Sequence, residues 1–276
     1  MFIDTHAHLD DKQFDADREE TIGRAFESGL ERIINIGAGL GSSERSVALA
    51  KKYENIYATV GLHPEYFMEH GTWSLEHKNK LEMLARAEKV VAIGEIGLDY
   101  YNHGKEMTED DKKFQKESFE YQLELARRLD LPVAIHCRGA RPADPAAHRE
   151  EPEAYEDVLE IIKKYPELNF VFHGYGGNLE FTRKALLEKN VIFSLAGNIT
   201  YNKPESEMFE VVKNIPLRKI MLDSDCPYLS PVPHRGERNE PAFVKFTAEK
   251  IAETKGLFPG EVEKITTENA KRFFRW

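Results

Sequence analysis

Four histidines and three carboxylates in this chain directly follow short apolar segments, where they could bind metal ions. His6 and His8 follow residues 2–4, and residues two apart on an extended segment point to the same side. The other candidates follow four further apolar segments: Glu95, His136, His173, Asp223 and Asp225. Each has an ordinary structural explanation when taken singly, as a core histidine or an ion-paired carboxylate. Their recurrence favours a metal centre instead.

The number and type of these groups indicate more than one ion. Neutral imidazole and carboxylate suit borderline to hard divalent cations, and the set is larger than one tetrahedral ion takes. Two ions about 4 Å apart are therefore the economical interpretation. Glu95 lies centrally in the order of the segments and could bridge them.

The apolar segments themselves predict the fold. They comprise residues 2–4, 32–36, 56–60, 90–93, 132–135, 169–172, 191–195 and 219–222. Segments with helical spacing, such as 112–129, 154–163 and 249–252, lie between or after them. Eight apolar strands alternating with helices predict parallel strands buried on both faces, and so an α/β fold, a (β/α)₈ TIM barrel forming one domain over residues 1–276. An open doubly wound sheet is the alternative.

A barrel would bring the candidate ligands together. The carboxyl ends of all strands open at one mouth, which is where such barrels carry their active sites. Three long loops are expected on the same side: residues 139–152, 198–207 and 226–241. The first of them resembles an insertion.

Composition excludes several classes of protein. Lys and Arg number 38 and Asp and Glu number 48, a formal charge of −10, which excludes nucleic-acid binding through bulk positive charge. No apolar run approaches the length of a membrane span, and the first residues lack a signal-peptide pattern. We therefore expect a cytoplasmic protein with no membrane partner, in which Cys137 and Cys226 are free thiols.

The motifs resemble those of the TatD-type metal-dependent deoxyribonucleases, within the amidohydrolase-like metallohydrolase barrels. Glu95 is the discriminating residue, because many relatives in the wider superfamily carry a carboxylated lysine there. The resemblance spans nearly the whole chain in order, through residues 4–9, 61–64, 94–100, 136–138, 173–177, 223–229 and 235–241.

The resemblance implies a ligand set. One ion would be held by His6, His8, Glu95 and Asp225, and the second by Glu95, His136 and His173. It further implies that Asp225 accepts a proton and that His63 faces the substrate, although a turn histidine before Pro64 is the plainer explanation of His63. Asp223 occupies a position where the family usually has Glu, and we expect it to support the ligands.

Some positions depart from the family pattern. Residues 174–177 read Gly-Tyr-Gly-Gly where Cys-Phe-Ser-Gly is usual, and Glu65 replaces a frequent His. With the insertion at 139–152, these departures affect the loops that shape a substrate pocket. The resemblance therefore implies the ligands more firmly than the substrate.

Further residues are candidates for substrate contact. Arg138, two residues after His136, could contact a phosphate or form an ion pair at the rim. Tyr100 and Tyr175, like Tyr101 and Tyr228, could stack on unpaired bases or simply cover a pocket. We expect two other arginines, Arg235 and Arg238, to be structural and to anchor Glu240 or other carboxylates.

The predicted activity is phosphodiester hydrolysis of DNA, preferably single strands or strand ends, by a two-metal centre containing Mg²⁺, Mn²⁺ or Zn²⁺ with Asp225 and Glu95 as catalytic residues. Deacylation of D-aminoacyl-tRNA at the same centre is the alternative, because the ligands do not separate the two. Amide or lactone hydrolysis and deamination are disfavoured, since the lysine bridge and a His-x-x-Glu pair are absent. A non-catalytic metal protein would instead show a closed ligand set.

Overall fold

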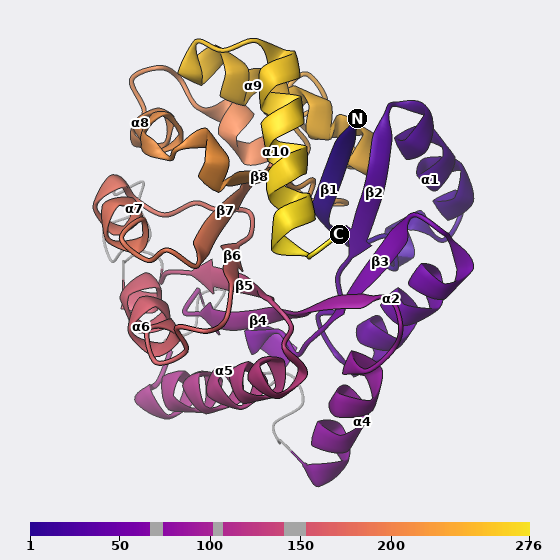
Figure 1. The fold of residues 1–276 in the computed structure, drawn as a ribbon, viewed down its shortest axis with the longest axis vertical. Coiled ribbons are helices and arrows are strands. Elements are labelled where there is room, and N and C mark those ends of the chain that lie inside the picture. Colours follow the sequence, from indigo (N-terminus) through magenta and orange to yellow (C-terminus); the bar gives the residue numbers. More distant parts are fainter. Residues whose placement is uncertain (67–73, 102–106, 141–152) are drawn as a thin grey trace.

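The computed structural model describes residues 1–66, 74–101, 107–140 and 153–276, and its centre is an eight-stranded parallel sheet in sequence order. The strands are β1 (Phe2–Ala7), β2 (Leu30–Asn35), β3 (Ile56–Val60), β4 (Val90–Asp99), β5 (Val133–Arg138), β6 (Phe170–Phe172), β7 (Val191–Leu195) and β8 (Ile220–Leu222). The first and last strands meet: Thr5 Oγ1 donates to the Leu222 carbonyl at 2.8 Å, and Ala7 bridges to Cys226. The predicted (β/α)₈ barrel is confirmed (Figure 1).

Helices follow the strands around the outside of the barrel. They are α1 (Arg18–Glu27), α2 (Leu40–Lys52), α4 (Leu75–Ala85), α5 (Glu109–Leu129), α6 (Glu153–Ile162), α7 (Leu179–Ala185), α8 (Glu207–Asn214), α9 (Val244–Lys255) and α10 (Pro259–Phe273). Short 3₁₀ turns include η1 (Lys12–Phe14) and η2 (Gly197–Tyr201). Among the described residues, no helix is long and apolar enough to span a membrane.

Local capping explains where several helices begin. α5 starts three residues before the predicted 112–129 because Thr108 and Asp111 form a reciprocal capping box. Its end at Asp130, in the left-handed conformation, precedes the Leu131-Pro132 break recognised in the sequence. Ser74, Asn178 and Ser206 likewise accept backbone hydrogen bonds at the starts of α4, α7 and α8.

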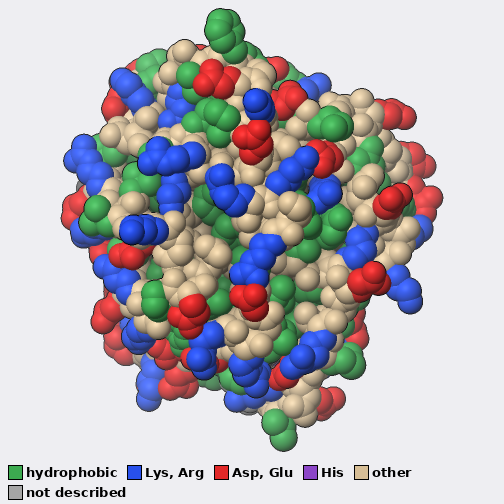
Figure 2. All heavy atoms as spheres, viewed as in Figure 1, with side chains coloured by type: hydrophobic (Ala, Val, Ile, Leu, Met, Phe, Trp, Pro, Cys, Tyr) green, Lys and Arg blue, Asp and Glu red, His purple; other side chains and the backbone are tan. Residues whose placement is uncertain are grey.

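The amino-terminal end of the barrel is closed by apolar side chains. Inward-facing residues of seven strands form one cluster with the end of the chain: Ile3, Ile34, Ala92, Ala134, Val171, Ile192 and Met221 pack with Phe273 and Phe274. Figure 1 shows α10 lying across this opening, close to both termini. The outer surface of the same face carries basic and acidic side chains interspersed with apolar ones (Figure 2).

Three strands run further than the apolar segments indicated. β4 continues to Asp99 instead of ending near residue 93, so Glu95 lies inside the strand and not after it. β1 likewise reaches Ala7 and β5 reaches Arg138. Backbone pairing sustains the extension, since Gly97 to Asp99 pair in register with His136 to Arg138. Residues 141–152, most of the predicted insertion, lie outside the described residues.

Candidate metal centre

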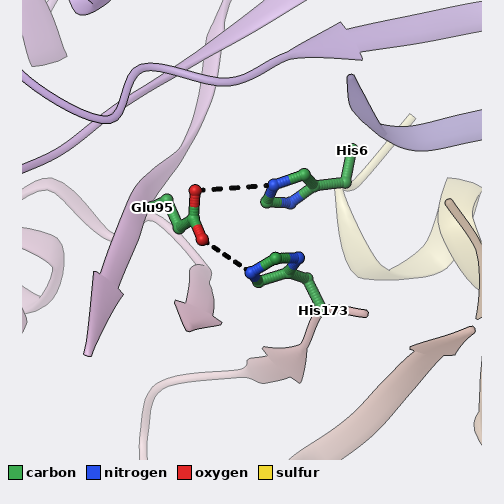
Figure 3. Close-up of side chains that lie close together, drawn as sticks. All are labelled: His6, Glu95 and His173. Atoms are coloured by element: carbon green, nitrogen blue, oxygen red, sulfur yellow. Dashed lines mark ion pairs between the residues drawn. The ribbon is translucent and has the colours of Figure 1, made fainter. Parts of the chain in front are cut away.

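The six predicted ligands converge at the carboxyl ends of the strands, around the carboxylate of Glu95. On one side, Glu95 Oε2 lies 3.6 Å from His6 Nε2 and 3.8 Å from His8 Nε2. On the other side, Glu95 Oε1 lies 2.6 Å from His173 Nε2 and 2.7 Å from His136 Nδ1. Figure 3 shows the carboxylate of Glu95, on β4, facing the stacked imidazoles of His6 and His173, whose centroids lie 3.7 Å apart, with one oxygen directed at each ring. Each of its oxygens thus faces a different group of histidines.

Asp225 lies close to His6 and His8, the histidines nearest Glu95 Oε2. Its Oδ1 lies 3.5 Å from His8 Nε2 and 3.8 Å from His6 Nε2. The donor atoms form three groups that could each hold a metal ion, and within each group the atoms lie within 4.8 Å of one another. They are His6, His8 and Asp225; His6, Glu95 and His173; and His63, Glu95 and His136.

His63 is closer to these donors than the sequence indicated. Its Nε2 lies 3.5 Å from Glu95 Oε1, and its ring meets that of His136 edge to face with centroids 4.2 Å apart. Its backbone N–H also bonds to Ala38, which fixes the turn before Pro64. Contact between His63 and a substrate remains a prediction. His63 is also a candidate metal ligand.

The state of His6, His173 and Glu95 fits a bound divalent cation. Both ring nitrogens of His6 and Nδ1 of His173 are buried without a hydrogen-bond partner among the described residues, a costly arrangement in the absence of a ligand. Burial lowers the pKa of His6 to about 3, so its imidazole is neutral and able to bind a metal. Despite burial, the neighbouring histidines hold the pKa of Glu95 well below its usual value. Neutral imidazole and ionised carboxylate are the forms that bind metal, so His6 and Glu95 are in the binding form. Despite burial, the hydrogen bond with Asp225 raises the pKa of His8 to about 9, and those with Asp99 and Glu95 raise the pKa of His136 to about 10, so a cation would displace a proton from each of these rings.

Other side chains fix the segment that carries Asp225. Buried Asp4 accepts hydrogen bonds from the Ser224 backbone N–H at 2.9 Å and its hydroxyl at 2.7 Å. Asn239, fully buried, donates to the carbonyls of Ser224 and Tyr228 at 2.6 Å each. These bonds tie the loop after β8 to β1 and hold the carboxylate of Asp225 in place.

Asp223 lies beside the donor groups, as expected of a supporting residue. It accepts hydrogen bonds from the Gly174 backbone N–H at 2.9 Å and from the hydroxyl of Ser194. Through Gly174 it restrains the turn that follows His173. Burial raises the pKa of Asp223 to about 6.

Asp99 is a functional candidate that the sequence analysis missed. Its Oδ2 lies 2.9 Å from His136 Nε2 and 2.6 Å from the guanidinium of Arg138. A carboxylate bonded to the outer nitrogen of a ligating histidine fixes the orientation of the ring and raises its basicity. A sequence signal existed: Asp99 is four residues after Glu95, so both face the same side of β4.

Five of the six predicted ligands, all except His6, line an open cavity of about 880 Å³. Arg138 lines it, with its guanidinium held by Asp99 and by Glu65 at 2.9 Å. Arg138 therefore forms the predicted ion pairs, and it also borders the cavity, where it could contact a phosphate. Tyr228 also lines the cavity and has half of its surface exposed, with its ring 6.1 Å from that of His8.

Two predicted substrate contacts are wrong. Tyr100 and Tyr175 are each 1% exposed and do not line this cavity. The hydroxyl of Tyr100 donates to Asp157 at 2.7 Å, and that of Tyr175 bonds to Thr182 at 2.7 Å. Both rings point into the layer between strands and helices, where their large apolar surface is buried.

The arginines after β8 have structural contacts, as predicted. Arg238 forms a two-pronged pair with Asp17 at 2.6 and 2.7 Å, which joins the loop to α1. Glu240 pairs instead with Arg24 at 2.7 Å. Arg235 stacks over the ring of Tyr201, 4.4 Å from its centroid.

Comparison with known proteins yields one family over nearly the whole chain. The TatD related DNase family matches residues 3–275. A metal-dependent hydrolase of Bacillus subtilis, YabD, is 38% identical over 100% of this chain and 99% of its own length. A Cronobacter sakazakii protein named 3'-5' ssDNA/RNA exonuclease TatD is 31% identical over 99% of this chain and 97% of its own.

Solved structures agree with this match. The crystal structure of YJJV, a TatD homologue from Escherichia coli, superimposes with a TM-score of 0.83 at 27% identity, covering 100% of this chain and 98% of that one. A TatD-family hydrolase from Entamoeba histolytica has a TM-score of 0.82 at 23% identity, with 99% and 97% coverage. The second likeness concerns the fold alone.

Proposed function

Since the chain belongs to the TatD-related DNase family and is a metal-dependent hydrolase, we propose that it cleaves phosphodiester bonds at the ends of single-stranded DNA. The name of the Cronobacter relative supports this substrate class and a nuclease over an aminoacyl ester hydrolase. The acidic charge of the chain is consistent with a local site that takes one strand end, and not with binding of long duplexes through bulk charge. We place this activity in the cytoplasm, where Cys137 and Cys226 would remain free thiols.

We propose that the centre holds two divalent ions. His6, His8, Glu95 and Asp225 would hold one, and Glu95, His136 and His173 the other. The mixture of imidazole and carboxylate donors suits Mn²⁺ or Zn²⁺ and also admits Mg²⁺. Such ions supply electrostatic stabilisation of the charge that develops on the phosphoryl group and activate water.

The side chains have distinct roles in this proposal. Asp225 accepts the proton of the attacking water, because its carboxylate reaches the cavity and neighbouring His8 keeps its pKa low despite burial. Arg138 binds a non-bridging oxygen of the phosphate, with its orientation fixed by Asp99. His63 lies beside Glu95 and faces the same cavity, where it contacts the substrate.

One observation carries the proposal: the two oxygens of one buried carboxylate, Glu95, lie close to different histidines, Oε2 to His6 and His8 and Oε1 to His136 and His173. A structural ion would need a closed set of ligands around a single point. Here the donors spread over three groups that share Glu95 or His6, at the floor of an accessible cavity.

Digestion of end-labelled substrates tests the proposal. Single-stranded DNA, duplex DNA and D-aminoacyl-tRNA are incubated with the protein and Mg²⁺, Mn²⁺ or Zn²⁺, and Glu95→Gln is compared with Glu82→Gln on the outer surface of α4. We expect the wild type and Glu82→Gln to shorten single strands and Glu95→Gln to be at least about a thousandfold slower. Equal turnover by Glu95→Gln would contradict the mechanism, and deacylation without DNA cleavage would contradict the substrate.

A further inference from the structure

Arg45 of α2 borders the same cavity as the metal centre but has no part in binding the metal. Its guanidinium bonds to Oδ2 of Asp10 at 3.1 Å, and the Asp10 side chain is 4% exposed. Arg45 itself is 59% exposed and lines the cavity. Among the described residues this is its one hydrogen bond, so most of the five N–H donors of its guanidinium are available to a ligand.

Asp10 is itself held by a buried network. Its Oδ1 accepts from Asn35 Nδ2 at 3.0 Å, and its Oδ2 also accepts from Ser42 Oγ at 2.9 Å. Asn35, fully buried at the end of β2, bonds in turn to the Leu9 N–H and to Ser46. The carboxylate therefore has one orientation, and it presents the guanidinium of Arg45 to the cavity at little entropic cost.

A second cation borders the same two hollows as Arg45. Lys12 of η1 is exposed and, like Arg45 and Asp10, lines both the cavity over the metal centre and an adjoining hollow of about 550 Å³. The charged residues lining that hollow comprise four basic and two acidic side chains: Lys12, Arg18, Arg45, Lys52, Asp10 and Asp15. Arg18 pairs with Asp15 and Lys52 with Glu19, so Lys12 and Arg45 against Asp10 leave a local excess of one positive charge, in a chain whose formal charge is −10.

The position of Arg45 differs from that of Arg138. Arg138 ends β5, whereas Arg45 follows β2, three strands away around the barrel. The two guanidinium groups therefore border the metal centre from different sides. A single phosphodiester group on the metal centre next to Arg138 leaves Arg45 and Lys12 to bind something else of negative charge.

We propose that Arg45 and Lys12 form a second phosphate-binding site, which takes the backbone phosphate next to the scissile one in a nucleic-acid strand. This inference rests on the proposed nuclease function and adds a requirement for substrate length. A strand bound in this way leaves the cavity through the hollow between η1 and α2. Substrates with neighbouring phosphates are then favoured over a lone phosphodiester.

Comparison of two substrates tests this site. Initial rates are measured with a single-stranded oligonucleotide and with bis(p-nitrophenyl) phosphate, a single phosphodiester, over a series of KCl concentrations. We expect Arg45→Ala to lower the ratio of kcat/KM for the oligonucleotide to that for the small diester by about tenfold. The slope of log KM against log salt for the oligonucleotide should decrease by about 0.7, as for one lost phosphate contact on a single strand.

Control variants separate the effect of losing the Arg45 charge from an effect on folding. Lys51→Ala removes a charge from the same helix outside both hollows and should leave the ratio and the slope unchanged, while Arg45→Lys should retain the slope because it keeps the charge. If the wild type hydrolyses both substrates and Arg45→Ala leaves the ratio unchanged, the second site is wrong and the proposed function stands. If the wild type hydrolyses neither, both are overturned.

Discussion

The two ends of the barrel bury different kinds of side chain. At the amino-terminal end, Phe273 and Phe274 pack against inward apolar residues such as Ile3 and Met221. At the carboxyl end, His6 and His173 are buried with ring nitrogens that lack partners among the described residues. The first end contributes hydrophobic stabilisation, and the second keeps unsatisfied polar groups in place for a ligand. The comparison indicates that stability and activity should respond to substitutions at different ends.

The largest effect is expected at the carboxyl end. Asp225→Asn preserves the shape of the side chain but removes the proposed proton acceptor, so kcat should decrease by at least about a thousandfold. The melting temperature should stay within a few degrees, because the packed core lies elsewhere. Single-turnover hydrolysis and thermal unfolding of the same preparation measure both. Activity within tenfold of the wild type would contradict the role of Asp225.

At the closed end, Phe274→Ala should do the reverse. Removing this nearly buried ring should lower the free energy of unfolding by about 3 kcal/mol, whereas kcat per folded molecule should be unchanged. Phe258→Ala is the matched control, because that ring is 81% exposed and should contribute less than about 0.5 kcal/mol. Urea titrations compare the variants. A loss of kcat without a loss of stability in Phe274→Ala would contradict the assignment of stability to one end of the barrel and activity to the other.

A smaller effect is expected from the carboxylate behind the ligands. Asp99→Asn removes the charge that orients His136 and Arg138, and metal affinity should fall about 10- to 100-fold. Raising the metal concentration should restore part of the activity, as expected for a positioning residue. Metal titrations of activity measure this change. An unaltered titration midpoint would show that His136 is oriented without Asp99.

The smallest effect concerns a tyrosine that the sequence placed near the substrate. Tyr100→Phe removes the hydrogen bond to Asp157 in the layer between β4 and α6 and should cost about 1 kcal/mol of stability. kcat/KM for single-stranded DNA should change less than about twofold. An increase of tenfold or more in KM would restore Tyr100 as a substrate contact.

The sequence predicted the strands, and the convergence of the candidate ligands, for one physical reason. Each candidate ligand directly follows or continues a buried strand, and a closed parallel barrel brings those positions together at one mouth. The resemblance assigned the ligands to two ions, and the two oxygens of Glu95, which lie close to different histidines, support that assignment.

Residues whose contacts depend on strand parity or on distant segments could not be placed as reliably. Tyr100 directly follows β4 and continues the alternation of Ile96 and Leu98, whereas Asp99 shares its face of the strand with Glu95. This alternation could have separated them, but the apolar segment indicated a strand that ended near residue 93. The bond from Asn35 to Asp10 joins separate elements, so no local pattern indicated that Arg45 borders the cavity.

The central claim is that Glu95 joins two ions in one centre, and metal stoichiometry tests it most directly. Protein loaded with Mn²⁺ and freed of excess metal is analysed by inductively coupled plasma mass spectrometry, alongside Glu95→Gln and the surface control Glu82→Gln. The account predicts two ions per chain in the wild type and in Glu82→Gln, and at most one in Glu95→Gln. A single ion in the wild type, or two retained by Glu95→Gln, would contradict it.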